Sequence, residues 1–487
     1  MDTFVSSFRP HGSDVIASWQ ATRWENAQTK RSGLARSWEG SVTKKTLILL
    51  LVLGSIVLLW AFDSQRRVAA QNETENESGV DRSIDNHARQ FLATGRQTFR
   101  FDTFGDEAFW GDMLKLHQAI EGAKLGGVGP GVSPATALAV GLKVDVDALP
   151  PHLITALQKG QVNLNDPATT LALLKLNSVV GLTGFFNDQG TLRGVGIQCA
   201  LCHSTVDNSL ALGIGHRLDA WANRDLNVGA IISLAPDLTH FTDLLGVDAN
   251  TVRTVLASWG PGCFDAELTK DGKALRADGK RACTLIPPAF GLAGVNLHTW
   301  TGFGSVPYWN AYVGVTEMGG SGTFFDARLS DPTQYPLAVK DGSFNVRLAP
   351  DLVTPKLGAL HFYQLAIPAP KPPQGSFDAT AAERGKDIFD GQGKCSTCHV
   401  PPLFSEPGNN LHAPSEIGVD SFQADRSPTH MYRTHPLKGL WTHTKGGFFH
   451  DGRFATLNDV VEHYNSFFNL GLNDRQVHDL VEYLKSL

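Results

Sequence analysis

Two five-residue segments with the pattern C-x-x-C-H constrain this chain more than any other feature. They occupy residues 199–203 and 395–399 and contribute Cys199, Cys202, His203, Cys395, Cys398 and His399. Two thiols three positions apart on one helical turn can both bond the vinyl groups of a porphyrin, and the adjacent histidine then reaches the iron. A single copy would also suit a thiol redox pair or half of a zinc site. Because both copies end in histidine and the chain has an export segment, the pattern predicts two covalently bound haem c groups, with His203 and His399 as iron ligands.

The length and charge of the chain narrow its class. With 487 residues it has room for two or three domains. Its formal net charge is -6, and it lacks a Gly-rich phosphate-binding motif, so we expect no nucleic-acid partner. Two cysteines remain outside the motifs, Cys263 and Cys283. In an oxidising compartment they are expected to close a disulfide around residues 264–282, and two free thiols are the alternative.

An apolar run near the N-terminus predicts attachment to a membrane. Residues 46–62 contain no charged side chain and are just long enough, with tilt or local thinning, to cross a bilayer once. Seven Lys and Arg residues precede them, which favours a cytoplasmic segment at 1–45 and haem domains in the periplasm. The alternative is a signal peptide cleaved after the small residues 68–70. We therefore expect a single-pass protein of the inner (cytoplasmic) membrane.

The rest of the chain divides into a tether and two haem domains. Residues 63–90 are polar and predict a flexible tether. Residues 91–366 are expected to form an N-terminal haem domain with insertions, although the role of the stretch 91–190 does not follow from its residues. Residues 367–375 are rich in proline and predict a linker, because such a segment cannot continue a helix. Residues 376–487 are expected to form a C-terminal cytochrome c domain.

Helical patterns bracket the second motif. Residues 379–390 precede it, and Asn473 can cap a terminal helix with one apolar stripe, formed by Val477, Leu480, Val481 and Leu484. Residues 288–302 echo residues 436–452, so the chain contains two related haem units. The expected fold class is all-α: two cytochrome c-like haem domains, the first with large insertions, preceded by one transmembrane helix.

The C-terminal domain resembles a known family. The motifs that carry the resemblance are Arg433-Thr434, Pro436, GFFHDG at 447–452 and TLNDVV at 456–461. They are similar to the C-terminal half of bacterial di-haem cytochrome c peroxidases. The relative that matures methylamine dehydrogenase, by oxidising tryptophans on a partner protein, shares this half. The resemblance extends over about residues 376–487, is weaker over 195–320 and is absent before about 190.

The resemblance implies a ligand for the second haem. In this family a residue just beyond the Thr-Leu-x-x-x-Val-x-x frame binds the second iron, and it is methionine in the peroxidases and tyrosine in the maturation enzyme. Counting along the same frame reaches Tyr464 in this chain. His463 and Met431 are the alternative ligands. An anionic oxygen ligand opposite His399 would favour ferric over ferrous iron.

The resemblance also implies residues at the first haem. The family places a tryptophan between the haems and a glutamate over the open iron face, in a Trp-x-Gly frame that ends in Glu-Met. Trp300 and Glu317 match in type, although the gap between them is three residues shorter than in the family. His298 is an alternative sixth ligand, which would keep the site closed until reduction opens it. The family's calcium site uses a Thr-x-Pro pair, whereas residues 444–447 lack the proline, so calcium remains an option without support from the residues.

Two main classes of function follow. In the first, a peroxidase-like oxidoreductase reduces hydrogen peroxide, or activates oxygen, at the Cys199 haem, while the Cys395 haem passes electrons from a periplasmic donor or a protein substrate. In the second, a membrane-anchored electron-transfer cytochrome c keeps both irons six-coordinate and has no catalysis. A third option is an oxygenase similar to the di-haem rubber-cleaving enzymes, with the stretch before residue 195 around a substrate channel. The paired units and Glu317 favour the enzyme.

Overall fold

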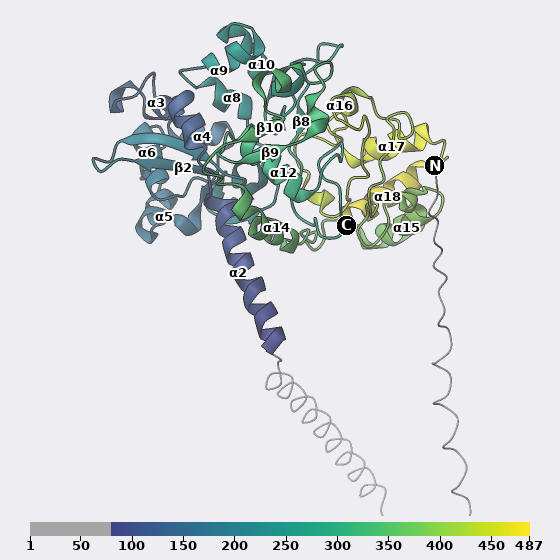
Figure 1. The fold of residues 1–487 in the computed structure, drawn as a ribbon. Helices are drawn as coiled ribbons and strands as arrows, with labels where there is room; N and C mark the ends of the chain where they lie inside the picture. Colours follow the sequence, from purple (N-terminus) through teal and green to yellow (C-terminus); the bar gives the residue numbers. More distant parts are fainter. Residues whose placement is uncertain (1–78) are drawn as a thin grey trace, which may run out of the picture. The chain divides into compact units, whose positions relative to one another are not determined.

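Helix α2 (Gly79–Phe101) opens the part of the chain that the structure describes. The structure is a computed structural model, and it describes residues 79–487 (Figure 1). Residues 79–90, which the sequence assigned to a tether, therefore belong to a helix. The cytoplasmic segment (1–45), the apolar run (46–62) and residues 63–78 lie outside the described residues. Among residues 79–487, no helix combines the length and the apolar character needed to cross a membrane.

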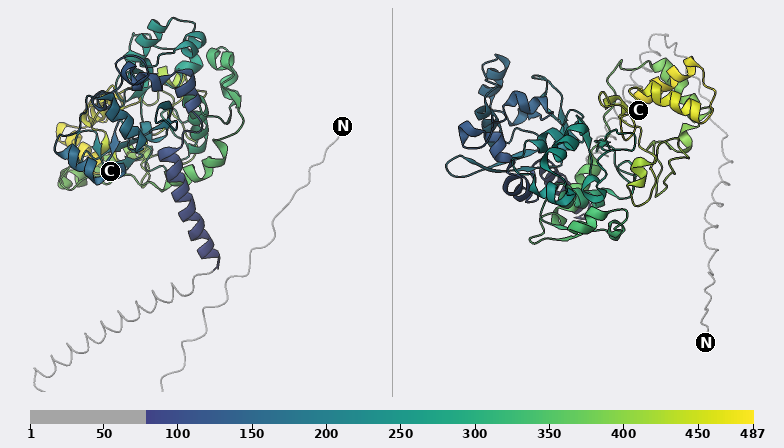
Figure 2. Two further views of the ribbon diagram at one scale, coloured as in Figure 1. Left: turned by 90° about the vertical axis from the view of Figure 1, so that its left-hand side faces the viewer. Right: turned by 90° about the horizontal axis from the view of Figure 1, so that it is seen from above.

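The C-terminal turns of α2 pack against α14 (Leu357–Ala366). Gly95 approaches α14 so closely that an added Cβ would lie 2.0 Å from the Ala359 carbonyl oxygen, so a larger residue does not fit. Phe99 is buried, with its ring centroid 5.7 Å from that of Tyr363. The first turns of α2 are exposed and project from the rest of residues 80–487 (Figures 1 and 2). Helix α2 is therefore anchored by its last turns.

Short helices and one hairpin make up most of residues 102–197. They are α3 (Leu116–Glu121), α4 (Pro134–Ala139), α5 (Pro151–Gln158), α6 (Pro167–Lys175), and the antiparallel pair β2 (Leu182–Phe186) and β3 (Leu192–Ile197). Three of the helices begin with proline, whose fixed φ suits the first helical turn. Trp110, Leu174 and Val195 share one hydrophobic core with Leu201 of the first motif. The stretch whose role the sequence left open thus packs around that motif.

Further short elements follow the first motif. They are α7 (Ala200–His203), α8 (Val228–Ser233), α9 (Thr239–Leu245), α10 (Ala249–Trp259), α11 (Leu268–Asp271), α12 (Val306–Tyr312) and α13 (Pro336–Asp341). The strands pair two by two: β1 (Val144–Asp145) with β5 (Ile214–Gly215), β4 (Ser204–Val206) with β6 (Arg217–Asp219), β7 (Cys263–Phe264) with β8 (Thr284–Leu285), and β9 (Thr323–Phe325) with β10 (Asn345–Arg347).

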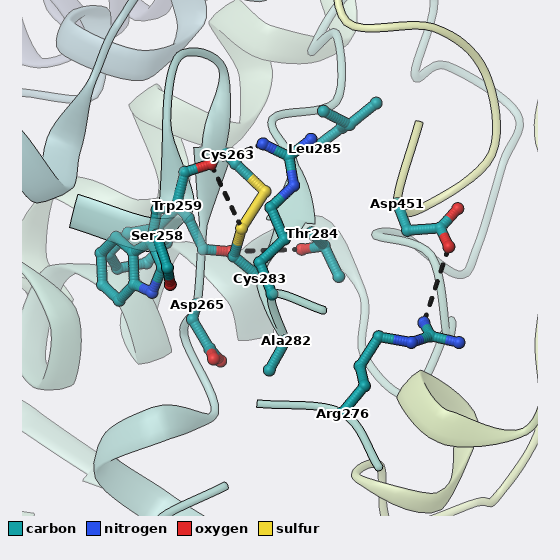
Figure 3. Close-up of a disulfide and its surroundings, with 12 residues drawn as sticks. Ser258, Trp259, Cys263, Asp265, Arg276, Ala282, Cys283, Thr284, Leu285 and Asp451 are labelled. Atoms are coloured by element: carbon teal, nitrogen blue, oxygen red, sulfur yellow. Dashed lines mark hydrogen bonds and ion pairs between the residues drawn. A yellow bond between two sulfur atoms is a disulfide. The ribbon is translucent and has the colours of Figure 1, made fainter. Parts of the chain in front are cut away.

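A disulfide joins Cys263 and Cys283, which confirms the predicted pairing (Figure 3). The pairing of β7 with β8 holds the two Cα atoms 5.7 Å apart. The bridge closes residues 264–282 into a loop, which we call the disulfide loop. Arg276 of this loop pairs with Asp451 at 3.5 Å (Figure 3). It also pairs with Asp420 at 2.8 Å. The disulfide loop is therefore bound to the C-terminal part of the chain.

Four helices organise the C-terminal part: α15 (Ala379–Asp390), α16 (Phe422–Asp425), α17 (Leu457–Phe467) and α18 (Asp474–Ser486). The bounds of α15 are those predicted. The Asn473 side chain accepts a hydrogen bond from the Gln476 N–H and caps α18, and the predicted apolar stripe of α18 is buried. Phe389 of α15 lies in the same core, and the two helices lie side by side (Figure 1).

The proline-rich segment 367–375 contacts both halves of the described chain. The Ile367 carbonyl accepts a hydrogen bond from the Gly291 N–H at 2.9 Å, and the Pro370 carbonyl accepts one from the Trp441 indole at 3.0 Å. The Trp441 ring meets that of Trp221 at 5.3 Å. Residues 80–487 accordingly form one compact unit.

The all-α prediction is wrong in one respect. The described residues are rich in helix, but they also contain ten strands in five two-stranded sheets. These strands have two to six residues each. Eight of the ten have only two or three residues, which is too short for a detectable alternation of polar and apolar residues.

Candidate functional site

Helix α7 places the three residues of the first motif on one helical turn. Cys199, Cys202 and His203 lie on a single turn, which the His203 N–H closes by donating to the Cys199 carbonyl at 3.1 Å. The His203 Nδ1 lies 3.1 Å from the Pro287 carbonyl oxygen. A proton on Nδ1 can donate to that oxygen and leave the Nε2 lone pair for a metal. Burial lowers the pKa of His203 to about 4, so the imidazole is neutral at pH 7, as a ligand must be.

The first motif opens into a cavity of about 350 Å³. Cys199, Cys202 and His203 line it, and apolar side chains of α8, α9 and α10 form much of the remaining wall. The polar residues of the wall include His298, Trp300 and Glu317, all three predicted from the sequence. The structure therefore brings the predicted residues of the first site to one cavity.

Glu317 ends the turn Val313–Glu317, which directly follows α12. Its side chain is 7% exposed, and its Oε1 accepts a hydrogen bond from the Thr316 hydroxyl at 3.0 Å. The Lys270 Nζ lies 3.4 Å from the same oxygen and comes from the disulfide loop. A carboxylate facing a cavity with one nearby cation can take up and release a proton there.

Trp300 connects the two halves of the described chain. Its indole N–H donates to the Leu285 carbonyl at 2.9 Å, and its ring stacks on His435 with centroids 4.8 Å apart. The preceding Thr299 has a φ of 64°, which is strained for a β-branched residue. Arg433 holds this turn, because its Nε donates to the Thr299 carbonyl and its backbone N–H donates to the Trp300 carbonyl at 3.2 Å.

His298 lies in the same cavity as His203. Its Nε2 is 3.0 Å from the Val295 carbonyl, and its backbone N–H donates to the Gly304 carbonyl at 2.9 Å. Burial, followed by the charge of Arg433, lowers the pKa of His298 to about 4. Its Nδ1 is the ring nitrogen without a carbonyl neighbour in this arrangement, so His298 remains a candidate ligand through that atom.

The second motif repeats the arrangement of the first. The His399 N–H donates to the Cys395 carbonyl at 2.9 Å, and the His399 Nδ1 lies 3.1 Å from the Phe404 carbonyl oxygen. Burial lowers the pKa of His399. In both motifs a backbone carbonyl thus orients the histidine and leaves Nε2 for a metal.

The three candidate ligands for the second site lie in different surroundings. Burial raises the pKa of the Tyr464 hydroxyl, and the charges of the Cys395 and Cys398 thiol groups raise it further. His463 packs against the Phe449 and Phe454 rings at 5.8 and 4.9 Å, and its Nε2 is buried without a partner. Met431 is 38% exposed. Tyr464 and His463 are therefore the two partly buried candidates, and Met431 is the exposed one.

Several buried polar atoms of the described residues lack a partner. They include Arg224 Nε and Nη1, Arg433 Nη1 and His435 Nε2. Burial lowers the pKa of Arg224 to about 10 and that of Arg433 to about 9. Haem carries two propionate groups, and carboxylates are the acceptors that buried guanidinium groups require. Together with the thiols, the oriented histidines and the cavity, these cations make the residues fit haem c.

The residues at the predicted calcium position do not fit a cation. The Lys445 Nζ lies 2.5 Å from the Asp225 Oδ1, and a Cβ on Gly446 would lie 3.3 Å from the Arg224 Nη1. Two positive charges therefore already occupy this place. Nearby, Asp420, His450 and Asp451 bring potential metal-binding atoms within 4.8 Å of one another, but Arg276 and Arg453 already pair with both carboxylates.

Comparisons with known proteins leave the family of the chain open. No protein-family model matches it, and no curated protein matches it. A solved structure of hydrazine synthase from Kuenenia stuttgartiensis is 20% identical over 44% of this chain and 75% of that chain, with a TM-score of 0.25. A MauG-like protein associated with microbial copper homeostasis is 16% identical over 45% of this chain and 76% of its own, with a TM-score of 0.29. At these TM-scores, neither likeness supports a conclusion about fold or function.

Three residues of the site were not predicted from the sequence: Lys270, Arg224 and His435. Lys270 belongs to a polar loop in which no spacing singles it out. His435 lies inside the Arg433–Pro436 segment that carried the family resemblance, so its position could have been suspected. The contacts of Lys270 with Glu317 and of His435 with Trp300 join segments far apart in sequence, and such contacts leave no periodic signal.

Proposed function

We propose that this protein is a di-haem oxidoreductase with peroxidase-like activity. Hydrogen peroxide, or oxygen, would be reduced in the cavity beside His203, with electrons arriving through the second motif. The observation that carries this proposal is that His203 and the Glu317 carboxylate line the same cavity. Haem, when bound at the two motifs, supplies the iron that exchanges electrons with the substrate.

Glu317 is proposed to move the protons of the reaction. Its carboxylate can take a proton from one oxygen of peroxide and return it to the oxygen that leaves as water. The Lys270 Nζ, at 3.4 Å, lies beside the carboxylate oxygen that would accept the proton. Apolar walls around the site limit the access of bulk water.

Trp300 and His435 are proposed to carry electrons between the two motifs. Their stacked rings come from the two halves of the chain and are 4.8 Å apart. Tyr464 is proposed as the ligand of the second iron, where an anionic oxygen would favour the oxidised state. The second site would then hold an oxidising equivalent rather than relay electrons at high potential.

We also propose that the protein faces the periplasm from the inner membrane. The support is the apolar run at 46–62 together with a disulfide in the described part, which requires an oxidising compartment. The electron donor would then be a periplasmic protein or another reduced partner.

Peroxide turnover by the purified holoprotein tests the proposal. We expect Glu317→Gln to lower the rate by about 10²–10⁴-fold, because it removes the proton acceptor, while the haem content stays unchanged. The matched control is Glu383→Gln, which neutralises an exposed glutamate on α15. His203→Gly should abolish turnover, and Tyr464→Phe should change the spectrum of the second haem.

Two results would contradict the proposal. One is a single haem per chain. The other is a pair of low-spin irons that admit no exogenous ligand in any redox state, which is the behaviour expected of a pure electron carrier with His298 bound at the first site.

A further inference from the structure

The disulfide loop carries an unusual density of buried charge. Four of its charged residues, Asp265, Glu267, Lys270 and Asp271, lie within or just before α11. Asp265 lies beside the disulfide (Figure 3), and its Oδ1 accepts a hydrogen bond from the Leu268 N–H at 3.1 Å, which fixes the start of α11. Asp265, Lys270 and Asp271 are buried and Glu267 is partly buried. Asp265, Glu267 and Lys270 line the cavity.

Arg426, directly after α16, enters the disulfide loop from the C-terminal part. Its Nη2 lies 2.9 Å from Asp265 Oδ1, and it forms a two-pronged pair with Asp271 at 2.7 and 2.9 Å. Its Nη1 donates to the Ala282 carbonyl at 3.2 Å. The Arg426, Asp265 and Asp271 side chains are all 0% exposed. The loop is thus held rigidly at its base.

Several residues of the same loop line the cavity, among them Lys270 and Glu267, and Glu317 lines it as well. The Tyr312 hydroxyl donates to the Ala266 carbonyl at 3.3 Å, and the Lys270 Nζ lies over the Tyr312 ring at 5.6 Å. Burial, then the charges of Glu317 and Glu267, raises the pKa of Tyr312 well above its ordinary value. Lys270 therefore contacts both Glu317, at 3.4 Å, and the Tyr312 ring, and the Tyr312 hydroxyl contacts Ala266, the residue before Glu267.

Hydrogen-bond accounting indicates that this cluster holds a proton. It contains four carboxyl groups, on Asp265, Glu267, Asp271 and Glu317, but only the two cations Lys270 and Arg426. Two buried acceptors of the cluster, Asp265 Oδ2 and Gln423 Oε1, have no donor. A proton on a carboxyl would supply one and reduce the excess of negative charge. Burial raises the pKa of Asp265 and of Glu267, which agrees with this count.

Other ionisable groups face the cluster from neighbouring elements. The Tyr335 hydroxyl donates to the Arg426 carbonyl at 3.2 Å, and His240 and Asp341 lie on the side of Lys270. Burial lowers the pKa of His240, so this imidazole is neutral at pH 7 and adds no cation. The excess of carboxylates over cations remains.

We propose that the disulfide loop is a buried proton store, in which Glu267 holds a proton and passes it towards Glu317 by way of Tyr312 and Lys270. This inference rests on the proposed function and names the residues that sustain it. Reduction of one peroxide to two waters consumes two electrons and two protons. The electrons come from the donor protein, and the two protons pass one after the other through Glu267, whose carboxylic acid becomes a carboxylate each time it releases one. Hydronium ions from solvent that enter the cavity protonate Glu267 again after each release.

Infrared spectroscopy of the holoprotein tests this store directly. A protonated carboxyl gives its own carbonyl band, which shifts in heavy water. We expect Glu267→Gln to remove one such band at pH 7 and to lower the rate of peroxide reduction about tenfold, with a larger loss at higher pH, where protons are scarce. Glu267→Asp should restore the band, and Glu383→Gln should leave band and rate unchanged.

A second variant keeps the test decisive if Glu267→Gln fails to fold. The Gln423 amide lowers the pKa of Glu267 by hydrogen bonding. Gln423→Leu should therefore make the band persist to higher pH, with Glu267 itself unaltered. A band unaffected by both variants would overturn the proposal.

The two proposals fail in different ways. The proposed function would be refuted if the wild-type protein shows no peroxide turnover. If Glu267→Gln still removes an infrared carboxyl band from that protein, the proton store is supported. The proton store would be refuted if the wild-type protein turns over peroxide and Glu267→Gln leaves the rate, the pH profile and the infrared band unchanged. The proposed function would not be affected by that result.

Discussion

Replacing Arg426 by methionine measures how much the buried ion pairs of Arg426 contribute to the free energy of unfolding. The substitution leaves Asp265 and Asp271 in the interior without their shared partner, and their side chains are 0% exposed. Breaking a buried ion pair from one side costs about 3–5 kcal/mol, because the remaining charge keeps its desolvation penalty. We therefore expect Arg426→Met to lower the free energy of unfolding by about 3–5 kcal/mol. Urea unfolding of the holoprotein, followed by circular dichroism at pH 7, measures this loss.

A matched control separates burial from the loss of an arginine. Arg384 also forms a two-pronged pair, with Asp479 at 2.7 and 2.6 Å, but its side chain is 41% exposed, and Asp479 also has His478 at 3.6 Å. Arg384→Met should therefore destabilise the protein clearly less. Neutralising both orphaned carboxyls, in the triple variant Arg426→Met, Asp265→Asn, Asp271→Asn, should recover part of the loss. If Arg426→Met is no more harmful than Arg384→Met, the reasoning about buried charge is refuted.

Two further predictions concern stability. The disulfide closes a loop with a sequence separation of 20, so the double variant Cys263→Ala, Cys283→Ala should lower the free energy of unfolding by about 3 kcal/mol in the chain-entropy view; a urea midpoint equal to that of wild type would contradict this. Burial raises the pKa of Asp106 to about 10. The folded state therefore binds a proton on the Asp106 carboxyl more tightly than the unfolded state does. The free energy of unfolding should fall as the pH rises from about 4 towards 10, by up to about 1.4 kcal/mol per pH unit. Asp106→Asn should flatten this slope between pH 5 and 8 in the same urea assay, and an unchanged slope would exclude Asp106 as its source.

Local signals in the sequence predicted local structure well. The bounds of α15 and the capped, striped α18 follow from caps and apolar spacing, which act over four residues or fewer. The disulfide followed from counting cysteines, because only two remained outside the motifs. The helical start of α2 was missed, since its first turns are polar and exposed and differ little in composition from a tether.

The candidate site was predictable in its residues but not in its connections. Glu317, Trp300 and His298 could be named from motif frames, and the structure brings them to the cavity beside His203. Arg426 and Lys270 could not be named, because the partner of each lies far away in sequence: Arg426 pairs with Asp271, and Lys270 with Glu317. Such pairs follow only from the packing of the disulfide loop against both halves of the chain.

The two carbonyl contacts that orient the motif histidines differ in the sequence separation between the contacting residues. His399 relies on Phe404, five positions later, whereas His203 relies on Pro287, 84 positions later. The contact that orients His399 can therefore form within one short segment, whereas the contact that orients His203 forms only once residues far along the chain have folded back on the first motif. If both motifs bind haem, as we propose, local structure can order the second site, while the first site, where we propose that peroxide reacts, depends on the tertiary fold.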